Sequence, residues 1–76
     1  KKMKNIIIIG ARGMGRSVYN YLEEMREYNV EFKIKGFLDD NVNALDDFKN
    51  YAPIISSVES YEICENDLFI CSLGDV

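Results

Sequence analysis

The order of hydrophobic and polar positions divides the first half of the chain into a strand, a helix and a second strand. Asn5–Ile9 contains four consecutive isoleucines, which is typical of a strand buried on both faces of a parallel sheet. Val18, Leu22 and Met25 recur at intervals of four and three residues, so they share one face of a helix. We expect that helix to end near Tyr28–Asn29, because Asn tolerates the left-handed conformation common after helix ends.

The second strand is indicated by alternation. Between Glu31 and Lys35, Phe32 and Ile34 point to one side and the charged residues to the other, which is the period of a strand. Gly36–Asp40 carries this strand to an acidic end.

The second half of the chain predicts shorter elements. Residues 41–51 are polar and fit a short helical turn. Pro53–Ile55 fits a short third strand, with Pro suited to an edge position. Ser56 or Ser57 can cap a brief helix. Asp67–Leu73 fits a fourth strand.

This order of elements predicts an α/β fold. Right-handed crossovers would give a Rossmann-like parallel sheet of about four strands in the order 3-2-1-4, with flanking helices. Only one long helix is evident, so we interpret residues 1–76 as one domain that is partial.

Composition excludes several classes of function. Nine basic and thirteen acidic residues give a net charge of −4, which disfavours non-specific nucleic-acid binding. No apolar run approaches the ~20 residues that a membrane-spanning helix needs, and we expect a cytoplasmic protein with no membrane partner. The spacing of Cys64 and Cys71 matches no zinc or redox motif, and we interpret both as small buried hydrophobes. The chain has no His, the commonest general base and metal ligand.

Gly10–Gly15 is the first candidate for chemistry. A glycine-rich turn between a strand and a helix presents unpartnered backbone N–H groups to an anion, and the helix dipole adds partial positive charge. The dinucleotide fingerprint G-x-G-x-x-G fits at Gly10 and Gly15, but Arg12 stands at its second glycine. Arg12 therefore weakens the case for NAD; it could meet a phosphate or carboxylate itself, or be a solvated loop side chain.

Two further segments end at the same predicted edge of the sheet. Asp39 and Asp40 follow the second strand, where an acidic residue can accept hydrogen bonds from ribose or sugar hydroxyls; the alternative is an ordinary turn. Ser72–Asp75 follows the fourth strand, where Gly74 permits close approach of a ligand or simply allows a β-to-α turn.

Four segments in this order resemble a known family. Ile-Ile-Ile-Gly-Ala-x-Gly-x-Gly-Arg, Gly-Phe-Leu-Asp-Asp, Pro-Ile-Ile-Ser-Ser and Phe-Ile-Cys-Ser-Leu-Gly-Asp resemble the N-terminal (PglD/NeuD-like) domain of sugar O-acyltransferases of the sialic-acid O-acetyltransferase and bacillosamine N-acetyltransferase type. The resemblance runs from Ile6 to Asp75.

The resemblance implies a Rossmann-like domain that binds a nucleotide sugar, such as a UDP-amino sugar. In such proteins it precedes a left-handed β-helix that binds acetyl-CoA and supplies a catalytic His, and the whole is a homotrimer. For this segment alone it implies no catalytic residue, no metal and no cofactor, with acetyl-CoA as donor in the parent enzyme. Together with the glycine-loop analysis, the resemblance gives these candidate substrate-binding residues: Gly10, Ala11, Arg12, Gly13, Met14, Gly15, Asp39, Asp40 and Gly74.

Two departures and two alternatives accompany this resemblance. The family usually has a small residue at the position of Arg12 and His at that of Met14. An NAD(P)-binding domain of an oxidoreductase or epimerase, and a non-catalytic nucleotide-sensing domain, are the competing hypotheses.

Overall fold

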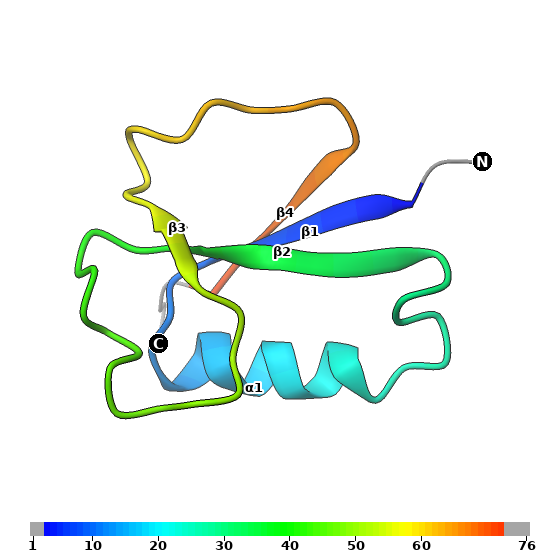
Figure 1. The fold of residues 1–76 in the computed structure, drawn as a ribbon, viewed down its shortest axis with the longest axis horizontal. Helices are drawn as coiled ribbons and strands as arrows, with labels where there is room; N and C mark the ends of the chain where they lie inside the picture. The colour runs from blue at the N-terminus through cyan, green and yellow to red at the C-terminus, as the bar shows by residue number, and fades with distance from the viewer. Residues whose placement is uncertain (1–2, 73–76) are drawn as a thin grey trace.

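The computed structural model describes residues 3–72. Within them the chain forms a parallel sheet in the order β3-β2-β1-β4 and one α-helix (Figure 1). The elements are β1 (Lys4–Ile9), α1 (Gly13–Glu23), β2 (Phe32–Leu38), β3 (Ile54–Ser56) and β4 (Asp67–Cys71). The predicted α/β class and strand order are confirmed, and β3, which follows Pro53, is an edge strand.

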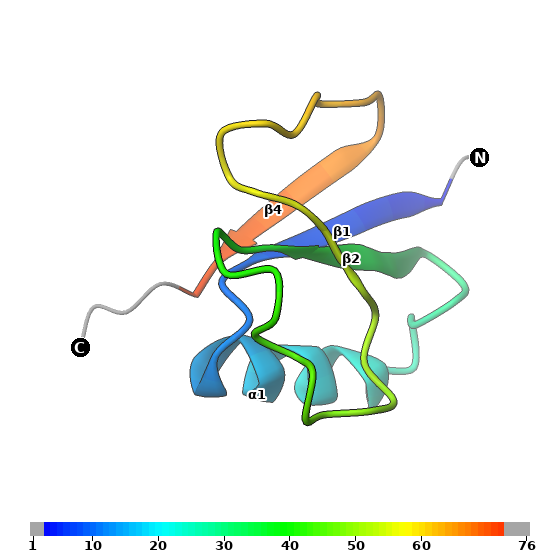
Figure 2. The same cartoon turned by 60° about the vertical axis from the view of Figure 1, so that its left-hand side comes forward.

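The two faces of the sheet are covered differently. In Figure 1 and in Figure 2 alike, α1 lies along one side of the sheet and the β3–β4 connection, residues 57–66, passes over the other. The β2–β3 connection, residues 39–53, runs beside α1, where the Arg16 guanidinium lies 3.8 Å from the centre of the Phe48 ring. No further α-helix occurs between residues 3 and 72, in agreement with the single long helix evident in the sequence.

The main core lies between α1 and the sheet. Ile6 and Ile8 of β1 pack there with Leu22 of α1, and the rings of Tyr19 and Phe37 stack with their centres 5.6 Å apart. Ile7 points the other way along the strand and is also fully buried. The isoleucine run is therefore buried on both faces, as predicted, and burial of each such side chain stabilises the fold by about 1.5–3 kcal/mol.

A β-bulge lies between β1 and β2. Ile6 is level with Ile34 and Ile7 with Gly36, so Lys35 is the extra residue. An extra residue reverses the alternation of side chains beyond it. Accordingly Phe37 belongs to the core beside α1, whereas Leu38 lines a cavity on the opposite face of the sheet.

The helix is shorter than predicted. It ends at Glu23 rather than near Tyr28–Asn29, and the chain continues in tight turns to β2. Asn29 has the left-handed conformation expected of it, with φ of 65°, and its amide donates to the Phe32 carbonyl at 2.6 Å. The chain must reverse direction here so that Phe32 can enter the sheet, and this requirement overrides the helical pattern.

The structure bears on three smaller predictions. Residues 41–51 form the expected turns, held by contacts such as that from the Phe48 amide to the Leu45 carbonyl at 2.9 Å. Residues 58–60 form a turn and not a helix, because the Ser57 hydroxyl accepts from the Ser60 amide at 3.3 Å without a helical ladder beyond it. The prediction of buried cysteines was wrong: Cys64 and Cys71 are both exposed, one on the β3–β4 connection and the other at the end of edge strand β4.

None of the helices in the described part of the chain has the length and hydrophobicity needed to cross a membrane.

Candidate functional site

A cavity of about 490 Å³ opens where β1 and β2 end and α1 begins. The carboxyl ends of parallel strands are where ligands bind in open α/β sheets, and the volume lies in the range of small-molecule sites. The lining residues come from the glycine loop, the end of β2, the β3–β4 connection and the residue after β4: Gly10, Arg12, Met14, Leu38, Asp39, Asp40, Asn41, Val58 and Ser72.

The three glycines of the loop have three different physical tasks. Gly10 has φ of 101°, a conformation that L side chains rarely adopt. Gly15 lies so close to the end of β1 that a Cβ atom built on it would be 1.9 Å from the Gly10 carbonyl oxygen. A Cβ on Gly13 would meet nothing within 4 Å. Gly10 therefore makes the turn and Gly15 lets the helix approach the strand, while Gly13 leaves open space at the helix start.

The start of α1 is available to an anion. Arg12 occupies the N-cap position without a side-chain capping bond, and the first turn contains no acidic residue. The amides of Gly13, Met14 and Gly15 have no acceptor within the helix, since the first turn of any α-helix lacks one. These amides and the helix dipole create positive potential beside the cavity.

The two arginines near the loop differ in how they are held. The Arg16 guanidinium donates to the Ala11 carbonyl at 3.1 Å and lies over the ring of Phe48. Arg12 is exposed, lines the cavity and makes no side-chain hydrogen bond or ion pair within residues 3–72. Arg12 is thus the cation that the cavity presents to an incoming group.

Asp39 holds the glycine loop in place. Its Oδ2 accepts the Ala11 amide at 2.8 Å, across 28 residues of sequence, and its Oδ1 accepts the Asn41 amide at 2.8 Å. Each carboxylate oxygen therefore accepts from one backbone amide. This arrangement fastens the end of β2 to the turn that follows β1.

Asp40 is placed differently from its neighbour. Its Oδ1 accepts the Val58 amide at 3.2 Å, and no hydrogen bond of its Oδ2 occurs among the described residues. A carboxylate oxygen open to the cavity can accept from a ligand hydroxyl. Of the two predicted acidic residues, Asp40 is the one with an oxygen that accepts no hydrogen bond within residues 3–72.

Most of the predicted site residues lie together. Gly10, Arg12, Met14, Asp39 and Asp40 line the cavity. Ala11, Gly13 and Gly15 belong to the same loop without lining it, Ala11 and Gly15 being buried. Gly74 lies outside the described residues.

Four lining residues were absent from the predicted site: Leu38, Asn41, Val58 and Ser72. Leu38 and Asn41 flank the acidic pair, so proximity in sequence could have suggested them. Ser72 belongs to the Ser72–Asp75 segment singled out in the sequence, of which only Gly74 was assigned to the site. The Ser72 hydroxyl donates to the Ile9 carbonyl at 2.8 Å and lies 3.1 Å from the carbonyl oxygen of Gly10. Val58 had no sequence signal, because only the path of the β3–β4 connection brings it here.

The cavity presents groups suited to binding. It is lined by one arginine and two carboxylates, and the helix start beside it has amides without a side-chain cap within residues 3–72; these groups suit a ligand with both anionic and hydroxyl groups. Residues 3–72 contain no group of three or more His, Cys, Asp or Glu side chains placed to hold a metal ion.

Comparison with known proteins identifies the family of the chain. The family model described as the PglD N-terminal domain matches residues 5–76. Searches of the curated proteins and of the solved structures find no significant match. The matched region includes the glycine loop, the acidic pair and β4, so the resemblance noted in the sequence is confirmed over nearly the whole chain. The chain belongs to the PglD N-terminal domain family, the type of domain found at the start of sugar acetyltransferases.

Proposed function

We propose that the chain is the acceptor-binding domain of an acetyl-CoA-dependent sugar acetyltransferase, and that its cavity holds a nucleotide sugar of the UDP-amino-sugar type. One observation carries the proposal: the uncapped start of α1 opens into the same cavity as Asp40. A nucleotide sugar has both of the groups that these features attract, a diphosphate and hydroxyls.

Each part of the ligand has a candidate partner. The phosphates would accept from the amides of Gly13 to Gly15 and from the guanidinium of Arg12. A ribose or sugar hydroxyl would donate to the open oxygen of Asp40. Asp39 supports this arrangement indirectly, since its carboxylate fixes the loop.

NAD fits this cavity less well. Close approach of a dinucleotide pyrophosphate uses the second glycine of the fingerprint, and that position is Arg12 here. The proposal extends to the parent enzyme: a left-handed β-helix beyond this domain would bind acetyl-CoA and supply the catalytic base, and would assemble the homotrimer.

The test is a titration of the chain with UDP, a UDP-amino sugar and NAD by calorimetry, followed by amide NMR. We expect the uridine ligands to bind and to shift the amide resonances of Gly13, Met14, Gly15 and Asp40. Binding of NAD without any heat from either uridine ligand would show that the domain serves a dehydrogenase or epimerase instead.

Arg12→Ala gives a second test of the same proposal. Loss of a charge-assisted contact with phosphate should weaken UDP binding by about tenfold or more. Arg26→Ala is the matched control, because Arg26 is also exposed but follows the far end of α1. Equal affinities of the two variants would remove Arg12 from the site.

A further inference from the structure

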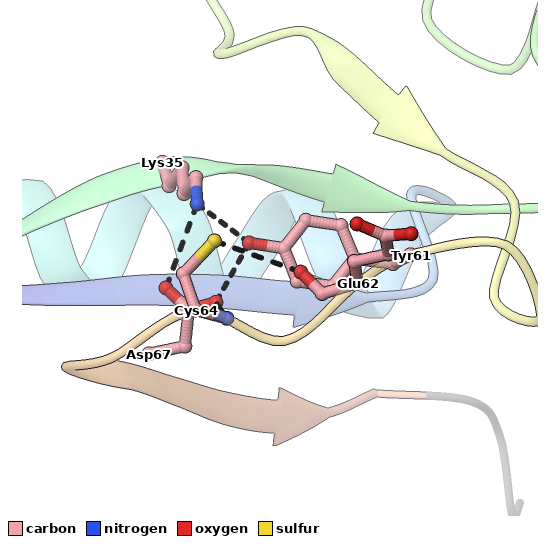
Figure 3. A network of polar contacts seen from close by, with 5 residues as sticks. All are labelled: Lys35, Tyr61, Glu62, Cys64 and Asp67. Carbon is pink, nitrogen blue, oxygen red and sulfur yellow. Dashed lines mark hydrogen bonds and ion pairs between the residues drawn. The ribbon is translucent and has the colours of Figure 1, made fainter.

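A polar cluster bridges β2 and β4 on the face of the sheet opposite α1. Figure 3 shows Lys35 of β2 reaching across β1 toward Asp67, at the start of β4, and Tyr61, on the β3–β4 connection. The Lys35 ammonium donates to the Tyr61 hydroxyl at 2.6 Å, and that hydroxyl donates to Asp67 Oδ2 at 2.7 Å. The cluster therefore fastens the connection to the two strands that flank β1.

Asp67 is the buried end of this cluster. Its side chain has no exposed surface, against 31% for Lys35. Oδ2 also accepts the Cys64 amide at 2.8 Å, while Oδ1 has no hydrogen bond and lies 3.6 Å from the Lys35 ammonium. A carboxylate with no exposed surface needs such partners, because leaving it unpaired is destabilising. The hydrogen bond from the Tyr61 hydroxyl is thus one of the contacts that stabilise the Asp67 carboxylate.

Packing alone does not fix the β3–β4 connection. Beneath it lies a cavity of about 260 Å³ lined by apolar and aromatic side chains: Ile9, Leu38, Val58, Tyr61, Ile63 and Phe69. Ile63 is 76% exposed and Val58 40%. This cavity is open to solvent, so packing against the sheet is incomplete and the polar anchors help to position the connection.

The connection has a second anchor at the candidate site. The Val58 amide donates to Asp40 Oδ1 at 3.2 Å, and Val58 and Leu38 line both this apolar cavity and the larger one. Val58 is therefore a wall of the ligand cavity, and the Asp40 carboxylate that would meet a ligand also holds Val58.

We propose that Tyr61, held between Lys35 and Asp67, is a positioning residue for the nucleotide-sugar cavity: it fixes the β3–β4 connection so that the Val58 amide engages Asp40 and orients its carboxylate. The proposal rests on the function proposed above. The contacts of Tyr61 would then favour ligand binding at Asp40, and a bound ligand would favour the anchored connection. The Val58–Asp40 hydrogen bond links the two. Lys35 is also the extra residue of the β-bulge, the point at which the alternation of side chains along β2 changes.

Tyr61→Phe tests this directly, because it removes one hydroxyl and keeps the ring that packs edge-on against Phe69 with ring centres 6.0 Å apart. Without any ligand, we expect the amide resonances of Val58 and Asp40 to shift and the Val58 amide to exchange with solvent faster. Tyr21→Phe is the control, since Tyr21 is an exposed tyrosine of α1. Unchanged Val58 and Asp40 amides in Tyr61→Phe would overturn the inference.

UDP affinity supplies the second measurement. We expect Tyr61→Phe to weaken UDP binding by about three- to tenfold, the worth of one hydrogen bond, with Tyr21→Phe unchanged. Lys35→Arg should retain parental Val58 resonances and affinity, and Lys35→Met should behave as Tyr61→Phe does. If UDP binds to none of these proteins, the proposed function fails while the ligand-free resonances still decide the role of Tyr61. Parental affinity in Tyr61→Phe would overturn the positioning role.

Discussion

Gly13 and Gly15 both lie in the first turn of α1, but only Gly13 has room for a side chain. The space around Gly13 is open, whereas Gly15 is in contact with the backbone at Gly10. A backbone contact cannot be relieved by turning a side chain, so a Cβ at Gly15 must push the helix away from β1. The glycine spacing alone does not distinguish these two positions.

We predict that Gly15→Ala lowers the free energy of unfolding by at least about 2 kcal/mol. Gly13→Ala should leave it unchanged or raise it by up to about 1 kcal/mol, because Ala is the better helix former. Urea denaturation followed by circular dichroism measures both. Similar stabilities for the two variants would contradict the close approach of α1 to β1.

Asp39 gives a second prediction at this scale. Asp39→Ala removes the acceptor of the Ala11 and Asn41 amides, so we expect a loss of about 1–3 kcal/mol in stability and a shift of the Ala11 amide resonance. Asp47→Ala is the control, because Asp47 is exposed and makes no side-chain hydrogen bond within the described residues. An unchanged Ala11 resonance in Asp39→Ala would show that the carboxylate does not hold the loop.

At the scale of elements, the β3–β4 connection is the segment whose position depends on charge. Hydrogen bonding to the Tyr61 hydroxyl raises the pKa of Lys35 above 10.5, although desolvation opposes this. Desolvation alone would raise the pKa of Asp67, but the bonds from Tyr61 and from the Cys64 amide, with the nearby Lys35 ammonium, outweigh it and bring that pKa below 3.8. Desolvation raises the pKa of Tyr61 above 10.0. The ammonium, phenol and carboxylate forms therefore coexist across the neutral range.

These shifts set a pH window for the anchor. Because the pKa of Asp67 is lowered on folding, its contribution to stability is present above pH 3.8 and is lost as the pH falls through the lower folded value. Lys35 has a raised pKa, so its contribution is present below pH 10.5 and is lost as the pH rises through the folded value. The anchor should be intact between these limits.

We predict that the parent melts at a higher temperature than Tyr61→Phe near neutral pH, and that this difference shrinks as the pH falls below 3.8. Protonation of Asp67 removes the charge that the Tyr61 hydroxyl stabilises. Thermal melts of both proteins from about pH 7 to pH 2 test this. A difference that stays constant down to the lowest pH would mean that Tyr61 does not stabilise the Asp67 carboxylate.

At the scale of the whole molecule, a single helix covers one face of a four-stranded sheet, and the described chain has a radius of gyration of 11.9 Å. A domain this small has limited apolar burial, so a ligand that joins the glycine loop to the acidic end of β2 should stabilise it measurably. UDP at a hundredfold excess over its Kd should add about 2.7 kcal/mol and raise the melting temperature by more than about 10 °C. Differential scanning fluorimetry with UDP, and with uridine as the control lacking phosphate, checks this. Equal shifts from both would argue against an anion site at α1.

Much of the fold could be predicted because it depends on local patterns. The isoleucine run, the alternation around Phe32 and the glycine loop each report a preference of neighbouring residues, and strand order follows from the handedness of crossovers. The candidate site was predicted where it lies at strand ends, at Gly10 and at the Asp39–Asp40 pair. Val58 was not, since a connection without periodicity has no signal for its path.

Local patterns in the amino-acid sequence were sufficient to predict the α/β class, the strand order 3-2-1-4 and a glycine turn before α1. The folded chain was needed to show that the helix ends at Glu23 and that the bulge falls at Lys35. It was also needed to show that both oxygens of Asp39 accept backbone amides, whereas one oxygen of Asp40 accepts none within residues 3–72. The physical reason is the range of the forces involved. Periodicity and turn chemistry act between neighbours, whereas the bond from Asp39 to Ala11 and the anchor at Tyr61 join residues that only the folded chain brings together.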